Sequence, residues 1–292
     1  MNSSALPPRH ALLALSVVAI WGSNFVVMKW ALAAFSPIWL AALRFSLAAL
    51  PLLWIARPAA PWRILAGYGL LIGVGQFGLL FWALQSAISP GMASLVVQSQ
   101  VFLTLLLGLL LRGQRLRAMQ GLALALAASG IAWIAWQLDG AASPLGLALV
   151  LGAALSWAVA NLVGQAAGKV DMLGFMVWSS ACAAPALIAL ALVFEGPQAL
   201  WTGVQAAQWD SWLAVLWQAV GNTLYGYGVW GWLLARHTAV QVVPMALLVP
   251  VFGMGCSAWW LGESLAAWKL QGAALVLAGL GLNLWAQWRN TR

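Results

Sequence analysis

Charged side chains are scarce in this sequence. Only 6% of its 292 residues are charged and 64% are hydrophobic, whereas an ordinary soluble domain carries about 25% charged residues. This composition excludes a chain that folds with water as its main solvent. The net charge is +8, but the Lys and Arg residues are scattered between apolar runs and do not form the clustered basic face of a nucleic-acid-binding protein. We therefore expect no nucleic-acid partner.

Residues that carry out catalysis or bind metals are equally rare. The sequence has two cysteines and two histidines. Cys182 and Cys256 lie in apolar stretches, so neither a disulfide framework nor a zinc site is indicated. His10 and His237 lie at the ends of apolar runs, and the sequence contains neither HExxH nor GxSxG, so no nucleophile has an evident base beside it. The sequence predicts no metal, no cofactor and no enzymatic activity.

Two glycine-rich strings fit the pattern GxGxxG. They are GVGQFG at 73–78 and GYGVWG at 226–231. Neither follows a strand and both lie inside apolar runs, which excludes a dinucleotide site. Small residues allow helices to approach closely in lipid, and they also serve as hinges. Both interpretations stay open for Gly75, Gly78 and Gly228.

Long apolar runs fill the rest of the chain. A bilayer core about 30 Å thick needs roughly 20 apolar residues per helix. The first run contains Asn24 and is longer than the apolar region of a signal peptide, so we interpret it as a permanent helix. The runs do not alternate as the strands of a membrane barrel do, which makes the fold an all-α integral membrane protein. The ten predicted spans are 11–30, 37–56, 64–86, 91–111, 118–136, 144–165, 172–194, 212–235, 239–261 and 268–287.

The charges in the loops orient these spans. Ten spans place both termini on one side, and ten of the 13 Lys and Arg residues fall in the termini and loops of that side. Positive charge marks the cytoplasmic side of a membrane protein. We therefore expect both termini to be cytoplasmic. Lys29 and Lys269 and four of the five acids, Asp139, Glu195, Asp210 and Glu263, fall at the opposite ends of the spans.

The two halves of the chain resemble each other. A shift of about 150 residues matches Trp82 with Trp232 and Phe102 with Phe252. Further matches follow in the same order, which indicates a duplication with repeats at 1–138 and 139–292. Each repeat has five spans, so the second crosses the membrane in the opposite sense. Inverted repeats are the usual frame of alternating-access transporters, whose substrate site lies near mid-membrane between the halves.

Two motifs carry a family resemblance. WGSNF at 21–25 and PVFGMGCSAWWLGE at 250–263 resemble the two EamA-type repeats of the drug/metabolite transporter superfamily. The resemblance covers essentially the whole chain and implies an exporter in the inner membrane of a bacterium. The first repeat departs from the pattern, because Gln100 stands opposite Pro250 and Gln114 opposite Glu263. We therefore expect the kink and the acidic helix end in the second half only.

The substrate is suggested by the same resemblance. The 21 tryptophans make the chain similar to exporters of aromatic and other uncharged amino acids. Transport of sugars or nucleotide-sugar-like metabolites is the alternative, and a non-transporting membrane scaffold is a further one. The expected partners are a small-molecule substrate and the lipid bilayer, and the sequence leaves the oligomeric state open.

Polar and aromatic side chains inside the spans are the candidate cavity residues, because polar groups are costly at membrane depth. Asn24 follows Trp21 by about one helical turn, and Asn161 follows Trp157 in the same way. The amides would suit the charged head of a zwitterion and the indoles its ring, while hydrogen bonding between helices is the competing explanation. The candidate set is Trp21, Asn24, Gln76, Phe77, Gln98, Trp157, Asn161, Tyr225 and Tyr227.

Arg44 and two prolines complete the candidates. Arg44 lies roughly 10 Å below the outer end of the second span, where it either reaches back to the interface or contacts a substrate carboxylate. Pro244 and Pro250 remove backbone hydrogen bonds and predict a kink in the ninth span. No carboxylate falls at the middle of a span, so we expect uniport or exchange without proton coupling. Glu263 is the one acid near enough to a span to argue otherwise.

Overall fold

The computed structural model describes residues 6–112, 118–137 and 142–290, and in these ranges it contains helices and no strand. An isolated bridge joins Ile88 to Ala142. The elements are α1 (Pro8–Ala31), α2 (Pro37–Ala49), η1 (Leu50–Leu53), α3 (Trp62–Leu70), η2 (Leu71–Gly78), α4 (Leu79–Ser86), α5 (Pro90–Val96), η3 (Val97–Ser99), α6 (Gln100–Arg112), α7 (Ala118–Trp136), α8 (Pro144–Gln165), α9 (Met172–Phe194), α10 (Gly196–Ala206), α11 (Trp209–Leu216), η4 (Trp217–Tyr225), α12 (Gly226–Arg236), α13 (Ala239–Val242), η5 (Val243–Leu247), α14 (Leu248–Leu261) and α15 (Ala267–Asn290).

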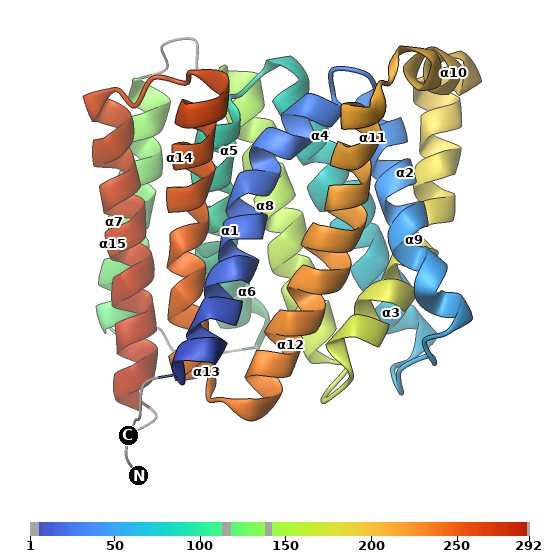
Figure 1. Cartoon of the computed structure of the whole chain (residues 1–292). Helices are drawn as coiled ribbons and strands as arrows, with labels where there is room; N and C mark the ends of the chain where they lie inside the picture. The colour runs from blue at the N-terminus through green and yellow to red at the C-terminus, as the bar shows by residue number, and fades with distance from the viewer. Residues whose placement is uncertain (1–5, 113–117, 138–141, 291–292) are drawn as a thin grey trace.

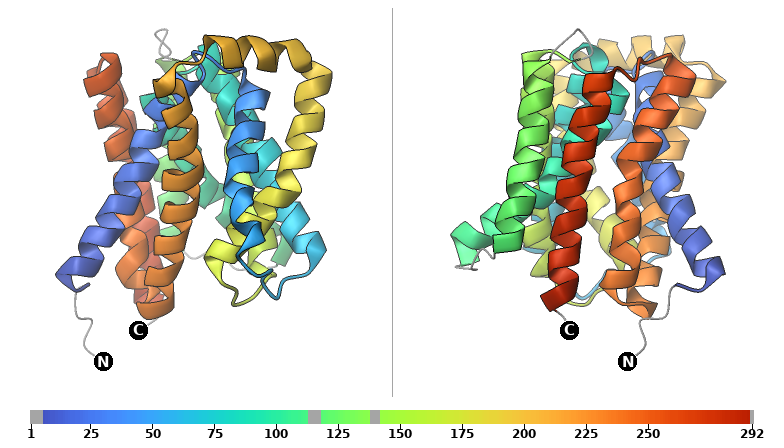
Figure 2. Two further views of the ribbon diagram at one scale, coloured as in Figure 1. Left: turned by 45° about the vertical axis from the view of Figure 1, so that its right-hand side comes forward. Right: turned by 90° about the vertical axis from the view of Figure 1, so that its left-hand side faces the viewer.

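The long helices stand side by side in one bundle (Figure 1). α1 begins and α15 ends at the lower end of the bundle in that view, so both ends of the described chain lie there. α10 lies across the upper end, which Figure 2 shows from two further sides. The sequence reasoning did not predict this short helix.

Each of the ten predicted spans coincides with helix to within three residues. Seven helical segments of the described chain are long and apolar enough to cross a membrane, and Pro37–Leu53 is apolar but shorter. The segments 209–236 and 267–290 are helical but carry Gln218, Asn222, Lys269 and Asn283 inside them. The structure thus confirms an all-helical chain with seven candidate spans, and the count of ten stays a prediction.

Five helical segments change their hydrogen-bonding pattern along their length. The third and eighth predicted spans contain π-helical stretches, η2 and η4, and the second, fourth and ninth contain 3₁₀ stretches, η1, η3 and η5. Pro244 lies in η5 and Pro250 near the start of α14. The kink expected in the second half only stays a prediction, but 3₁₀ stretches occur in both halves. η3 interrupts the fourth segment without a proline, where that segment packs against α8.

The first helices of the two halves run in opposite directions. At the end of α1, Lys29 Nζ donates to the carbonyl oxygens of Leu84 and Gln85, both at 2.8 Å. At the start of α8, the Ser143 amide donates to the Ala87 carbonyl at 2.8 Å. α1 thus ends where α8 begins, as an inverted repeat requires. The predicted boundary between residues 138 and 139 lies outside the described residues.

Equivalent helices of the two halves pack on each other. α2 packs against α9 and α7 against α15, which pairs the second predicted span with the seventh and the fifth with the tenth. Glycines allow the close approach of the latter pair, because a Cβ on Gly130 would lie 3.0 Å from the carbonyl oxygen of Gly272. The two halves are thus in contact at both sides of the bundle, at α7 and α15 on the left of Figure 1 and at α2 and α9 on the right.

Candidate functional site

Arg44 on α2 is buried inside the bundle. Its side chain is 1% exposed, so it does not reach back to the membrane interface. Nη2 donates a 3.2 Å hydrogen bond to Thr223 Oγ1 on η4. The guanidinium carbon lies 3.6 Å from the centroid of the Phe77 ring on η2. The second, third and eighth predicted spans therefore meet at this arginine.

The guanidinium has more donors than partners. Nε and Nη1 are buried and have no hydrogen-bond partner in the described part of the chain. The contact with Phe77 is a cation–π interaction, which offsets part of the desolvation cost but gives the N–H groups no acceptor. A planar carboxylate can accept two parallel bonds from an arginine. The surroundings of Arg44 therefore lack what an anionic ligand would supply.

Aromatic rings extend from Arg44 to α1. Tyr227 lies on α12, four residues after Thr223, and its ring centroid lies 5.4 Å from that of Trp21. The Trp21 indole donates a 3.1 Å hydrogen bond to the Asn222 carbonyl oxygen. We call these five side chains the Arg44 site: Trp21, Arg44, Phe77, Thr223 and Tyr227.

Two of the predicted amides are buried and have atoms without a hydrogen-bond partner in the described chain. Asn24 is 1% exposed and Gln76 is 4% exposed. Both amide atoms of Asn24 and Oε1 of Gln76 have no hydrogen-bond partner in the described ranges. An unmade buried hydrogen bond costs about 1–3 kcal/mol, and native proteins contain few of them. A polar ligand would satisfy such groups.

Asn161 lies in a separate polar cavity of about 320 Å³ between α6, α8 and α15. Its Nδ2 donates to Gln100 Oε1 at 2.8 Å and to Thr104 Oγ1 at 3.2 Å. These are hydrogen bonds between helices. Asn283, from α15, is 1% exposed, and its Oδ1 has no partner in the described chain. We call this cavity the amide pocket; its lining contains no charged side chain.

The remaining predicted cavity residues are more dispersed. Gln98 is buried in η3, and Trp157 is half-buried on α8. Tyr225 is partly exposed, and its hydroxyl hydrogen-bonds with Ser16 Oγ on α1 at 2.7 Å. The structure brings Trp21, Phe77 and Tyr227 to Arg44 and places Asn161 in the amide pocket. A single cavity that joins the indole and amide pairs of both halves stays a prediction.

The predicted hinge glycines fall into two groups. A Cβ on Gly75 would lie 1.9 Å from Ser156 Oγ, so this glycine permits close packing on α8. A Cβ on Gly78 or Gly228 would meet nothing closer than 3.8 Å or 3.7 Å, respectively. Packing does not explain a glycine at these two positions, and the hinge interpretation stays open for them.

The sequence reasoning missed Thr223 and Asn283. Both are polar residues within helical segments, so the same criterion that selected Asn24 would have found them. Thr223 is 179 residues from Arg44 in the chain, and only the fold brings the two together. Sequence spacing contains no signal for that pairing.

Comparison with known proteins assigns both halves to one family. Residues 9–136 and 144–285 each match the EamA-like transporter family. These two matches confirm the resemblance seen in the sequence motifs.

Similar proteins are known from several bacteria. The chain is 38% identical over 283 residues to the "Probable amino-acid metabolite efflux pump" of Salmonella typhimurium, covering 94% of this chain and 95% of that protein. It is 36% identical over 289 residues to the Escherichia coli protein of the same name, and the match covers 96% of this chain and 97% of that protein. A solved structure titled "Crystal structure of protein" superposes with a TM-score of 0.59 at 20% identity, covering 97% of this chain and 99% of the other, which shows a shared fold.

Proposed function

Because the chain belongs to the EamA-like transporter family, we propose that it exports small zwitterionic or uncharged metabolites, with aromatic and other neutral amino acids as the main substrates. The names of the Salmonella and Escherichia relatives support this class. The observation that carries the proposal is the Arg44 site. There a buried guanidinium with two unpartnered nitrogens in the described chain lies beside aromatic rings.

Each part of an aromatic amino acid has a counterpart in and around this site. The carboxylate accepts a hydrogen bond from Nη1 or Nε of Arg44, because charge-assisted hydrogen bonds are roughly twice as strong as neutral ones. The side-chain ring packs against Trp21 and Tyr227. The ammonium group binds the buried amide oxygens of Asn24 and Gln76, which have no partner within the described residues.

The position of the site supports transport by alternating access. Trp21, Arg44 and Phe77 come from the first half of the chain, and Thr223 and Tyr227 come from the second. Transporters built from inverted repeats bind substrate at the interface between repeats. The proposal includes ten spans in the inner membrane of a bacterium, with the lower end of the bundle in Figure 1 on the cytoplasmic side. Arg9, Arg57, Arg63, Lys169, Arg236 and Arg289 support this orientation by sequence position.

The amide pocket favours a second candidate function, transport of sugars or related uncharged metabolites. Its amides and hydroxyl can donate and accept hydrogen bonds, and it contains no group that would neutralise an ionic ligand. Nucleotide-sugar-like anions fit less well, because Arg44 is the one buried arginine of the described chain.

Flux through purified protein in liposomes tests both candidates. We expect counterflow of labelled phenylalanine or leucine, and a loss of affinity on the order of 100-fold in Arg44→Gln, since charged hydrogen bonds contribute about 1.5–3 kcal/mol. Arg57→Gln is the matched control, because Arg57 stacks on Trp62 near the lower end of the bundle. Unchanged affinity in Arg44→Gln would remove the carboxylate role. Flux of sugars without amino acids would favour the second candidate, and no flux at all would favour a scaffold.

A further inference from the structure

Two glutamates of the second half bind the starts of two helices of the first half. Glu195 follows α9 and binds the start of α2, while Glu263 follows α14 and binds the start of α5. All four helix ends lie at the upper end of the bundle in Figure 1. These carboxylates therefore connect the two repeats on one face of the protein.

Glu195 supplies the cap that α2 lacks. α2 begins with Ser36-Pro37, and Ser36 does not cap its own helix. Instead, Ser36 Oγ donates to Glu195 Oε2 at 2.7 Å. The amides of Ile38 and Trp39 donate to the same carboxylate, both at 3.0 Å. Negative charge is favourable at a helix N-terminus, where these amides have no intrahelical acceptor.

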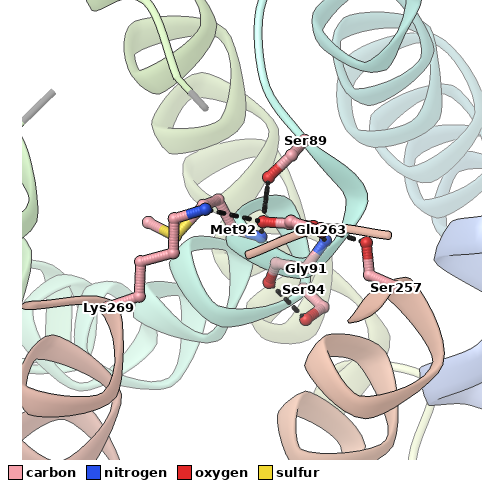
Figure 3. Close-up of polar contacts among 7 residues, drawn as sticks. All are labelled: Ser89, Gly91, Met92, Ser94, Ser257, Glu263 and Lys269. Carbon is pink, nitrogen blue, oxygen red and sulfur yellow. Dashed lines mark hydrogen bonds and ion pairs between the residues drawn. The ribbon is translucent and has the colours of Figure 1, made fainter. Parts of the chain in front are cut away.

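Glu263 makes the equivalent contacts at α5, which begins with Ser89-Pro90 (Figure 3). The Gly91 amide donates to Glu263 Oε2 at 3.0 Å, and the hydroxyls of Ser89 and Ser257 also donate to the carboxylate. Lys269 Nζ lies 3.4 Å from Oε1, with the lysine side chain 3% exposed and the glutamate 10% exposed. Figure 3 shows these groups converging on one carboxylate from three separate segments.

The two contacts follow the symmetry of the repeats. α9 and α2 belong to the seventh and second predicted spans, and α14 and α5 belong to the ninth and fourth. Each glutamate thus follows one helix and caps the start of its counterpart in the other half. A glycine with positive φ adjoins each one, Gly196 at 75° and Gly262 at 65°, and turns the chain so that the carboxylate faces the other repeat.

At the opposite end, no carboxylate of the described residues caps a helix of the other half; a hydrogen bond of 2.7 Å between His10 and His237 joins the halves there instead. There α9 is capped by its own Asp171, whose Oδ2 accepts the Gly174 amide at 2.6 Å. The loop from Trp54 to Trp62 contains no acid. Gln114, which stands opposite Glu263 in the repeat, is neutral and lies outside the described residues. An inverted repeat could place the same contacts on both faces, and this chain places them on the upper face.

We propose that Glu195 and Glu263 are gating residues: paired latches that hold the non-cytoplasmic end closed while substrate enters from the cytoplasm. Opening to the outside separates both carboxylates from α2 and α5 and hydrates them together with Lys269. This inference rests on the proposed transport function, which assigns the upper end to the outside and gives the opening its role. The contacts of the two glutamates form in the absence of substrate, so they can be tested separately.

Labelling of a buried cysteine tests the latch. Ser94 on α5 is 0% exposed and faces α14, where a Cβ on Gly253 would meet its side chain. Ser94→Cys, in a Cys182→Ser and Cys256→Ser background, would react with a membrane-impermeant maleimide from outside only when the upper end opens. We expect Glu195→Gln and Glu263→Gln each to raise the labelling rate about tenfold, the effect of weakening one charge-assisted hydrogen bond.

Asp210→Asn is the matched control, because Asp210 lies in the first turn of α11, near the same face, and accepts the amide of the adjacent Ser211 instead of binding a helix of the other half. Its labelling rate should stay at the parent value. Ser36→Ala and Ser89→Ala each remove one hydroxyl donor to the glutamates. These variants replace Glu195→Gln or Glu263→Gln in the labelling experiment if a glutamine variant does not fold. An unchanged rate in the folded latch variants overturns the proposal. Faster labelling in a protein without amino-acid flux would keep the latch and reject the proposed substrates, so the two failures are distinguishable.

Discussion

Ser156 on α8 donates a 2.7 Å hydrogen bond to the carbonyl oxygen of Leu71, the first residue of the π-helical stretch η2. A π-helical turn changes which carbonyl oxygens accept a backbone hydrogen bond. Here the donor to the Leu71 carbonyl oxygen is a hydroxyl from the neighbouring helix α8. Gly75, in the same stretch, lies against that serine. The contact between the third and sixth predicted spans therefore includes a glycine that permits close approach and a hydroxyl that donates to the backbone.

Gly75→Leu should destabilise the folded protein. The new side chain would overlap Ser156, and overpacking of this kind typically costs about 1–3 kcal/mol. Thermal unfolding in detergent, followed by tryptophan fluorescence, measures the effect. Gly78→Ala is the control, because its Cβ would meet nothing closer than 3.8 Å. Equal stability of Gly75→Leu and the parent protein would show that close packing is not the role of this glycine.

Gly228→Ala separates flexibility from packing in the eighth predicted span. The added Cβ would lie 3.7 Å from Leu173 Cδ1, an ordinary contact, so we expect stability to change by less than about 0.5 kcal/mol. If the backbone there bends during transport, the flux in liposomes should fall several-fold. Normal flux at normal stability would exclude a hinge at this position.

Trp21→Phe should cost about 1 kcal/mol of stability, because the Asn222 carbonyl loses its indole donor while the ring contact with Tyr227 is largely retained. Trp21→Ala should cost more, about 3–5 kcal/mol, since the cavity left by the ring adds to the loss. Unfolding in detergent compares the two variants. Trp54→Phe, at a side chain 80% exposed, is expected to be neutral.

Asn161→Leu tests the amide pocket. It removes the donor to Gln100 and Thr104, and hydrogen bonds between membrane helices contribute about 0.6–2 kcal/mol. If the pocket binds substrate, the apparent KM for transport should rise as well. Ser129→Ala, whose hydroxyl donates to the Leu126 carbonyl oxygen within α7, is the control. A stability loss with an unchanged KM would leave Asn161 a purely structural role.

Cysteine labelling in intact cells checks the orientation, with Ala59→Cys and Gln208→Cys in the cysteine-free background. Both positions are exposed. Residue 59 lies between η1 and α3, and residue 208 lies between α10 and α11; α10 lies at the upper end of the bundle in Figure 1. An impermeant maleimide should label the cysteine at position 208 only, because ten spans place residue 59 in the cytoplasm. Labelling at position 59 alone would invert the topology, and labelling at both would refute the span count.

The sequence was sufficient for features that depend on burial in lipid. The helical segments followed from the scarcity of charge, and their bounds followed from Pro, Gly and Arg at the breaks. The repeat followed from matched residues such as Trp82 and Trp232. These signals are local or periodic, so they can be recognised without knowing which helices touch.

The contacts within the Arg44 site could not be predicted from the sequence. The interaction of Arg44 with Thr223 and Phe77 depends on how three helices pack, and no spacing rule encodes it. The 3₁₀ stretch at Val97–Ser99 was missed because only proline was used to predict an interruption. Glu195 and Glu263 were assigned to helix ends, yet their binding to the other half appears only in the folded chain.

The matching positions of η2 and η4 have a consequence for the history of the chain. A π-helical turn takes up an extra residue in a helix, and such turns are rare. Both stretches occur in the third predicted span of their own half, so a single event before the duplication accounts for both, whereas independent origins would require the same change twice. By this parsimony argument, the irregular turn is older than the duplication that the two family matches indicate.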